Sequence, residues 1–219
     1  MEITTVNQRS FSLFNEKHLL AIRIWHWTTF LVISASLITV LLASTMFSTK
    51  SNLSMITEQI QRKGGVVTPV QARAVAHEYS DKLWMVHKYI GYGLCFLLLC
   101  RILIETFIAK KEKIFSKIKN ALMLRNRAPA YSDRNYYLWA KYGYLFFYLT
   151  LLIMAVTGLG LAYEEVPILK SLHKTLIQIH SIAQYLIYFY ILTHLIGVIR
   201  ADTTNSKGIV SGMIHGDYL

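Results

Sequence analysis

Four long apolar stretches separated by polar segments set the pattern of the chain. They cover residues 24–46, 83–107, 138–162 and 176–199. Each is long enough to cross roughly 30 Å of hydrocarbon, since a transmembrane helix needs about 20 residues. The pattern therefore predicts an all-α membrane protein, a four-transmembrane-helix bundle that forms one domain over residues 23–200.

The polar segments complete the predicted organisation. Residues 1–22 are typical of a leader with an interfacial amphipathic helix, and residues 201–219 form a tail. A glycine pair and a Thr-Pro pair divide the 47–82 loop into two helical stretches, so we expect a small helical loop on that side of the membrane. The 108–137 loop is basic and contains a proline, which indicates a solvated surface.

Composition and charge agree with a membrane location. The 219 residues are 54% hydrophobic and only 16% charged, which is lean for a soluble domain. The net charge of +11 does not indicate nucleic acid, because the basic residues collect beside the spans. Thirteen lie on the side of the termini and the 108–137 loop, and seven lie on the other side. The positive-inside rule therefore puts both termini in the cytoplasm.

Four of the eight histidines fall inside the predicted spans. In this topology His26 and His194 lie at the cytoplasmic level, and His87 and His180 lie at the outer level. His180 and His194 are 14 residues apart, which is about 21 Å along a helix, so one metal ion cannot bind both. The spacing predicts two stacked haem sites, each with two axial histidines from different helices. No CxxCH motif for covalent haem attachment is present.

Cations near these levels are candidates for binding haem propionates. Arg101 follows His87 by 14 residues, so it lies on nearly the same helix face at the cytoplasmic level. An inner haem would pair with Arg101, helped by Arg23 or Arg200. Two alternatives to propionate binding are equally open: the Arg101 side chain snorkels to the interface, or it pairs with Glu105. The weaker candidates for an outer haem are Lys88, Lys170 and Lys174.

Glycines accompany the histidines in three of the spans. They are Gly91, Gly93, Gly158, Gly160 and Gly197. A flat macrocycle needs backbone that lets it approach, but close packing between helices needs the same. The glycines alone therefore leave both interpretations open.

Four motifs carry a resemblance to a known family. They read "RIWHW" at 23–27, "HKYIG" at 87–91, "TGLGL" at 157–161 and "HSIAQYLIYFYILTH" at 180–194. With them the chain, over roughly residues 20 to 215, resembles the bacterial cytochrome b561 and nickel-iron hydrogenase cytochrome b family. That family also includes the membrane subunit of formate dehydrogenase.

The resemblance implies cofactors and partners. It implies two haems b, with His26 and His194 as axial ligands of the cytoplasmic-side haem and His87 and His180 as those of the outer haem. Electrons would pass between a quinone pool, of menaquinone or ubiquinone, and a redox partner protein on either side of the bacterial inner membrane. Under this resemblance Trp25 packs against the haem edge; an ordinary interfacial tryptophan is the open alternative, and Trp27 has the same two interpretations.

The leading hypothesis is thus a di-haem b-type cytochrome, an electron-transfer subunit with no catalytic residue assigned and quinone reactivity left open. One alternative is a superoxide:quinone oxidoreductase, which would need a cationic funnel that the outer loop, at net +2, supplies weakly. A proton or metal transporter is the rival from another class, and it is disfavoured because Glu105 is the sole acidic residue in the spans. A structural anchor and a homodimer also remain open.

Overall fold

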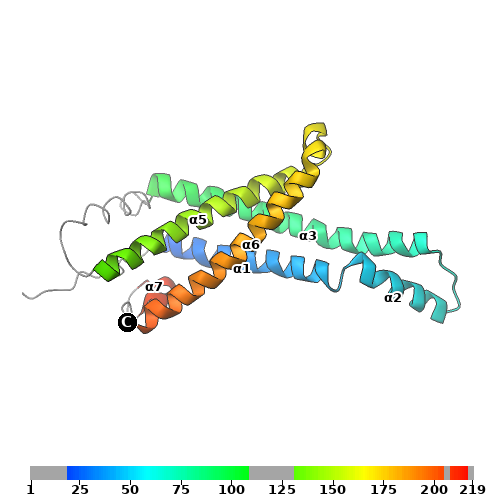
Figure 1. Cartoon of the computed structure of the whole chain (residues 1–219), viewed down its shortest axis with the longest axis horizontal. Helices are drawn as coiled ribbons and strands as arrows, with labels where there is room; N and C mark the ends of the chain where they lie inside the picture. Colours follow the sequence, from blue (N-terminus) through cyan, green and yellow to red (C-terminus); the bar gives the residue numbers. More distant parts are fainter. Residues whose placement is uncertain (1–18, 109–130, 205–207, 217–219) are drawn as a thin grey trace, which may run out of the picture. The chain divides into compact units, whose positions relative to one another are not determined.

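The computed structural model describes residues 19–108, 131–204 and 208–216, and within these ranges it contains helices and no strand. Figure 1 shows the helices in chain order. They are α1 (Leu20–Ser44), α2 (Thr49–Arg62), α3 (Pro69–Leu103) with a π-helical turn at Ile104–Ile108, α5 (Tyr131–Ala162), α6 (Pro167–Thr203) and α7 (Ile209–Ile214). Four of them, α1, α3, α5 and α6, are long and apolar enough to cross a membrane. The predicted all-α membrane bundle is confirmed.

Helical structure extends beyond the apolar stretches at several ends. The third helix begins at Pro69, whereas hydropathy alone starts the span at residue 83. A capping box explains this early start: the Thr68 backbone N–H donates to Gln71 Oε1 at 3.0 Å, and the Gln71 N–H donates to Thr68 Oγ1 at 3.3 Å. Pro69 takes the first helical position, where its missing N–H costs nothing. One continuous helix therefore serves both the outer loop and the span.

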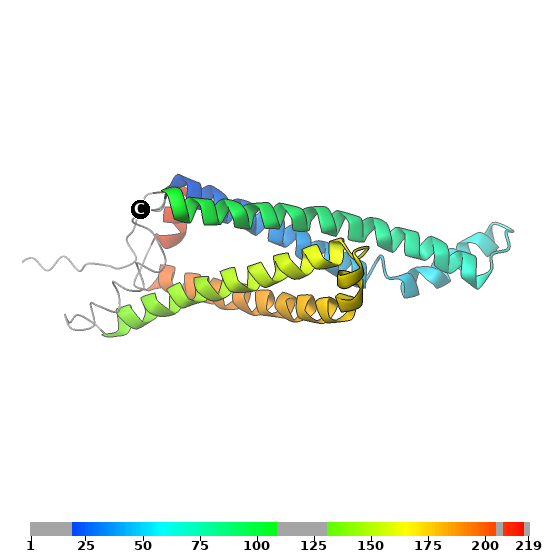
Figure 2. The ribbon, with the colours of Figure 1, turned by 90° about the horizontal axis from the view of Figure 1, so that it is seen from above.

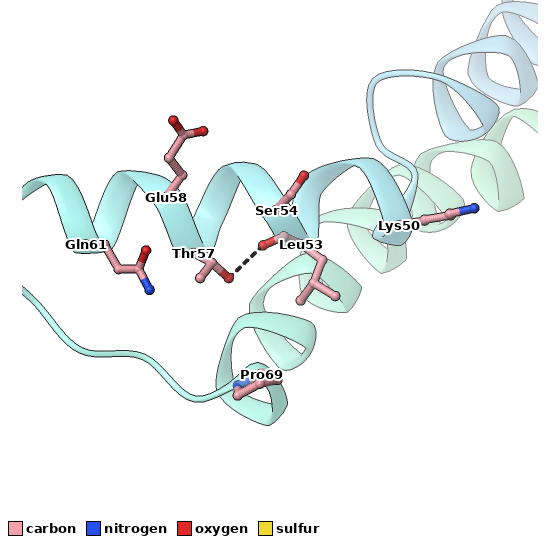
Figure 3. A pocket seen from close by; sticks show the side chains of 7 residues that line it. All are labelled: Lys50, Leu53, Ser54, Thr57, Glu58, Gln61 and Pro69. Atoms are coloured by element: carbon pink, nitrogen blue, oxygen red, sulfur yellow. Dashed lines mark hydrogen bonds between the residues drawn. The ribbon is translucent and has the colours of Figure 1, made fainter.

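The α2 helix packs on the first turn of α3. It ends at Arg62, and Gly64, two residues later, has a φ of +79°, the left-handed conformation common after a helix end. In Figure 3, Leu53 and Thr57 lie on the side of α2 that faces Pro69, while Glu58 points away. A shallow groove lies there, and its lining contains no histidine. The lining of this groove therefore offers no haem ligand.

The chain forms two compact units. The first, here called the outer-pair unit, contains residues 24–102 and 151–183; the second contains residues 1–23, 103–150 and 184–219. In the outer-pair unit α1 and α3 run side by side, and the end of α5 meets the start of α6 in an antiparallel pair joined by a short turn (Figures 1 and 2). All four membrane-length helices thus enter this one unit.

The interior of the outer-pair unit is unusually rich in small hydroxyl side chains. Thr29, Ser36 and Thr39 are buried along α1, and Thr157 is buried on α5. Many large apolar side chains of the same helices are exposed, Phe30 and Phe96 among them. Exposed apolar side chains are expected where lipid surrounds a bundle, so the polar interior is the feature that needs an explanation.

The second unit contains the later part of α6 and the early part of α5. Tyr190 stacks on Phe147 with centroids 4.7 Å apart, which joins α6 to α5. The short α7 was not predicted; its Ile214 carbonyl accepts a hydrogen bond from the Arg23 guanidinium. Residues 20–22, assigned from sequence to the leader, already belong to α1. The rest of the predicted interfacial helix and most of the 108–137 loop lie outside the described residues.

Candidate haem site

Four side chains, one from each membrane-length helix, define a site in the outer-pair unit. Thr39 on α1 lies beside His87 on α3, with 2.7 Å between Oγ1 and Nδ1. Thr157 on α5 lies beside His180 on α6, with 2.9 Å between the same two atom types. The two imidazoles lie in the same unit, close enough for a charge on one to affect the other. Two histidines that are 93 residues apart in the sequence therefore belong to one arrangement.

Each threonine is fixed by its own helix. The Thr39 hydroxyl donates to the Ser36 carbonyl at 2.6 Å, and the Thr157 hydroxyl donates to the Ile153 carbonyl at 2.7 Å. Such bonds to a carbonyl three or four residues back are common for threonine in helices. Because both threonines are buried, each oxygen is held at a defined place beside its histidine ring.

The glycines of the spans divide into two groups by what surrounds them. A Cβ at Gly158 would lie 3.3 Å from Cε1 of His180, and one at Gly160 would lie 2.9 Å from Cδ1 of Leu176. These two glycines let α5 and α6 approach closely. A Cβ at Gly93 would be in ordinary contact with α1, whereas one at Gly91 would have no heavy atom within 4 Å. Among these four glycines, Gly91 is the one whose surroundings fit the approach of a flat macrocycle.

Trp25 and Arg101 join α1 to α3. The indole N–H of Trp25 donates to the Leu97 carbonyl at 2.7 Å. The Arg101 guanidinium lies 5.7 Å from the centroid of the same indole, which is cation–π distance. Both side chains are buried, Arg101 at 6% exposure. Trp25 is therefore a buried interhelical contact, and the burial of Arg101 argues against the alternative in which its side chain snorkels to the interface.

The other two predicted axial ligands lie in different units. His26 belongs to the outer-pair unit, is half-buried, and meets Trp27 edge to face with centroids 5.3 Å apart. His194 belongs to the second unit and stacks on Tyr190 with centroids 5.6 Å apart. Each unit is defined by itself, so the pairing of His26 with His194 stays a prediction from spacing.

The remaining predicted cations have varied surroundings. Arg23 donates to the backbone of α7, although a guanidinium has further donors. Arg200 is exposed near the end of α6, and Lys88, Lys170 and Lys174 are exposed as well. Among the candidates for propionate binding in the described parts of the chain, Arg101 is the one that is buried.

Sequence reasoning missed the roles of Thr39 and Thr157. Thr157 stood in the "TGLGL" motif, where the Thr-Gly pair could have been read as a hydrogen-bonding group next to a clearance for a ring. Thr39 gave no comparable signal, because a threonine in an apolar helix is common and its partner lies on another helix.

The donor set and its surroundings fit haem b. Two imidazoles and a buried cation lie in the same unit, and a Cβ at Gly91, one turn after His87, would have no heavy atom within 4 Å. No group of three or more histidine, cysteine or acidic side chains suited to a metal ion occurs in the described ranges. The residues present thus fit a haem that His87 and His180 would hold.

Comparison with known families agrees with this interpretation. The sequence model for prokaryotic cytochrome b561 matches residues 17–216. The chain therefore belongs to the prokaryotic cytochrome b561 family, and the predicted family resemblance is confirmed. Comparisons with curated proteins and with solved structures found no match. Membership implies haem b, electron transfer across the membrane and a multi-pass bacterial membrane protein.

Proposed function

We propose that this chain is a di-haem b-type cytochrome that carries single electrons across the bacterial inner membrane between a quinone pool and a redox partner protein. The observation that carries the proposal is the convergence of one side chain from each of four spans: His87 and His180, with Thr39 and Thr157 at their Nδ1 atoms. Two half-buried imidazoles with buried hydroxyl partners inside a membrane bundle are costly, so a function is expected to require them.

His87 and His180 are the proposed axial ligands of one haem. Each ring has one nitrogen beside a threonine, so the other nitrogen remains for the iron. The haem, when bound, supplies one-electron redox chemistry, and the protein supplies ligands, burial and neighbouring charge. Gly158 keeps the helix backbone clear of the His180 ring.

His26 and His194 are the proposed ligands of a second haem, from their equal depth in the predicted topology. Arg101 is its proposed propionate partner, since a buried guanidinium needs an anion or a polarisable ring beside it. Arg23 and Arg200 are secondary candidates, and Lys88 and Lys174 are weak candidates at the other haem. With both termini in the cytoplasm, this second haem is the cytoplasmic-side one.

Haem counting on the purified full-length chain tests the proposal. We expect a b-type reduced spectrum and two haems per chain. His87→Ala and His180→Ala should each remove the same haem, and His26→Ala and His194→Ala should each remove the other. A chain without haem would favour the transporter alternative, and a different grouping of the four variants would refute the pairing.

Electron transfer is tested in vesicles that enclose ferricyanide and receive a quinol from outside. Oxidation of one quinol releases two electrons and two protons, so two ferricyanide ions should be reduced per quinol. We expect this reaction with the wild-type chain and its loss in His87→Ala and His194→Ala. Wild-type vesicles that bind haem but fail to oxidise either menaquinol or ubiquinol would exclude the quinone link.

A further inference from the structure

We propose, building on the assignment of His87 and His180 as axial ligands, that Thr39 and Thr157 are positioning residues for this haem. They hold both rings with the proton on Nδ1, and by accepting hydrogen bonds there they lower the reduction potential of the iron that both rings bind. The two spans that supply no ligand to this haem thereby control its chemistry.

A hydrogen bond from a threonine hydroxyl to a carbonyl of its own helix does not by itself support the proposal. The hydroxyls of Thr57, Thr150, Thr193 and Thr203 also donate to a carbonyl three or four residues back. Thr39 and Thr157 differ because each also lies within hydrogen-bond distance of a histidine Nδ1. Both histidines of the site thus have a threonine that contacts a carbonyl and a ring nitrogen, and the two threonines lie on different helices.

The hydroxyl distances fix the direction of each hydrogen bond. A hydroxyl has one proton to donate. The Oγ1 atoms of Thr39 and Thr157 lie 2.6 and 2.7 Å from carbonyl oxygens, which is the spacing of an O–H···O hydrogen bond. Two oxygens so close would repel without a proton between them. The proton is therefore on the carbonyl side, and the threonine oxygen can only accept from the ring.

The histidine must then be the donor. His87 and His180 each donate an Nδ1–H to a threonine oxygen. With Nδ1 protonated, the neutral ring carries its free electron pair on Nε2, the atom that binds iron.

An acceptor at Nδ1 makes the ring a stronger electron donor through Nε2. Ferric iron gains more from a stronger donor than ferrous iron does, so the potential falls. Each threonine is itself polarised by donating to a carbonyl, which strengthens the effect. Both rings carry the same arrangement, and so the two effects act on one iron.

The test compares isosteric variants of the full-length protein by redox titration, with both haems followed by their visible spectra. Thr39→Val and Thr157→Val remove the hydroxyl and keep the side-chain shape. We expect each to raise the midpoint potential of one haem, the same haem in both, and to leave the other unchanged. The double variant should show a larger rise. Thr39→Ser and Thr157→Ser keep the hydroxyl and should stay near the wild-type value.

Thr150→Val is the matched control, since Thr150 is buried on α5 and donates to the Phe146 carbonyl at 2.9 Å with no histidine partner in the described structure. A similar shift in the control, equal shifts in the valine and serine variants, or shifts of two different haems would each overturn the proposal. Loss of haem from the valine variants alone would support it; loss from the serine variants as well would overturn it. Should His87→Ala and His180→Ala remove no haem, the axial assignment itself fails.

Discussion

Gly158→Ala tests whether clearance for the His180 ring is what the site requires. The new methyl group would lie 3.3 Å from Cε1 and 3.8 Å from Nδ1 of His180, so the ring must move by a few tenths of an ångström. The ring is held by Thr157, the residue next to the glycine, through a 2.9 Å bond. A small displacement stretches that bond toward the limit of about 3.2 Å for a good hydrogen bond.

For Gly158→Ala, the loss in hydrogen bonding and the gain in helix propensity predict a change at the His180 ring with little change in the free energy of unfolding. Weakening the hydrogen bond costs at most about 0.5–1.5 kcal/mol. Replacing glycine by alanine inside a helix returns about 0.8–1.0 kcal/mol. The two effects nearly cancel, so the free energy of unfolding should stay within about 1 kcal/mol of wild type. The His180 ring, however, cannot keep its orientation.

The assay measures haem content, midpoint potentials and the electron paramagnetic resonance signals of the ferric haems in the full-length protein. We expect Gly158→Ala to alter the signal and potential of one haem, and to lower its retention. Gly160→Ala is the control: it brings the same helix-propensity gain, and its methyl group meets Cδ1 of Leu176, the end of a flexible side chain, at 2.9 Å. Equal haem changes in both variants, or none in Gly158→Ala, would refute the reasoning.

Three further substitutions test the surroundings of the site. Trp25→Phe removes the N–H that binds the Leu97 carbonyl, so thermal unfolding in detergent should show a loss of about 1 kcal/mol with both haems retained. Arg101→Gln removes a buried cation and should lower the potential of the haem not bound by His87, as redox titration would show; an unchanged potential would exclude a propionate there. Gly91→Ala meets no protein atom within 4 Å, so reduced haem content in this variant would indicate a macrocycle beside Gly91, and full content would argue against it.

Hydropathy and spacing predicted the class of this fold because bilayer thickness limits what a spanning segment can be. Hydropathy alone did not find the start of α3 at Pro69, which the Thr68-Pro69 pair predicted instead. The capping box at Thr68 and Gln71 lies far outside the apolar stretch, and helix propensity continues where hydrophobicity stops. Helix ends depend on local hydrogen bonds, while spans depend on average apolarity, so the two boundaries differ.

The candidate site was predictable in part for a similar reason. Histidines in spans attract attention because an imidazole in hydrocarbon is costly, and helical periodicity then assigns their depth. This reasoning does not find the threonines that contact Nδ1 of His87 and His180. Thr39 and Thr157 satisfy their own hydroxyls within their helices, so neither looks costly in the sequence, and contacts between helices cannot be derived from the spacing within one helix.

The buried hydroxyls at positions 39 and 157 are not required for helix packing. Close packing of membrane helices requires small residues, and alanine or glycine would serve at positions 39 and 157 without any polar cost. The threonine hydroxyl already donates a hydrogen bond to a carbonyl of its own helix. That bond satisfies the hydroxyl, so no second polar partner is needed. The second contact at both positions is a histidine ring nitrogen, and a bundle held together only by packing has no need to orient two imidazoles. The hydroxyl pair therefore supports ring orientation as the property that these positions maintain.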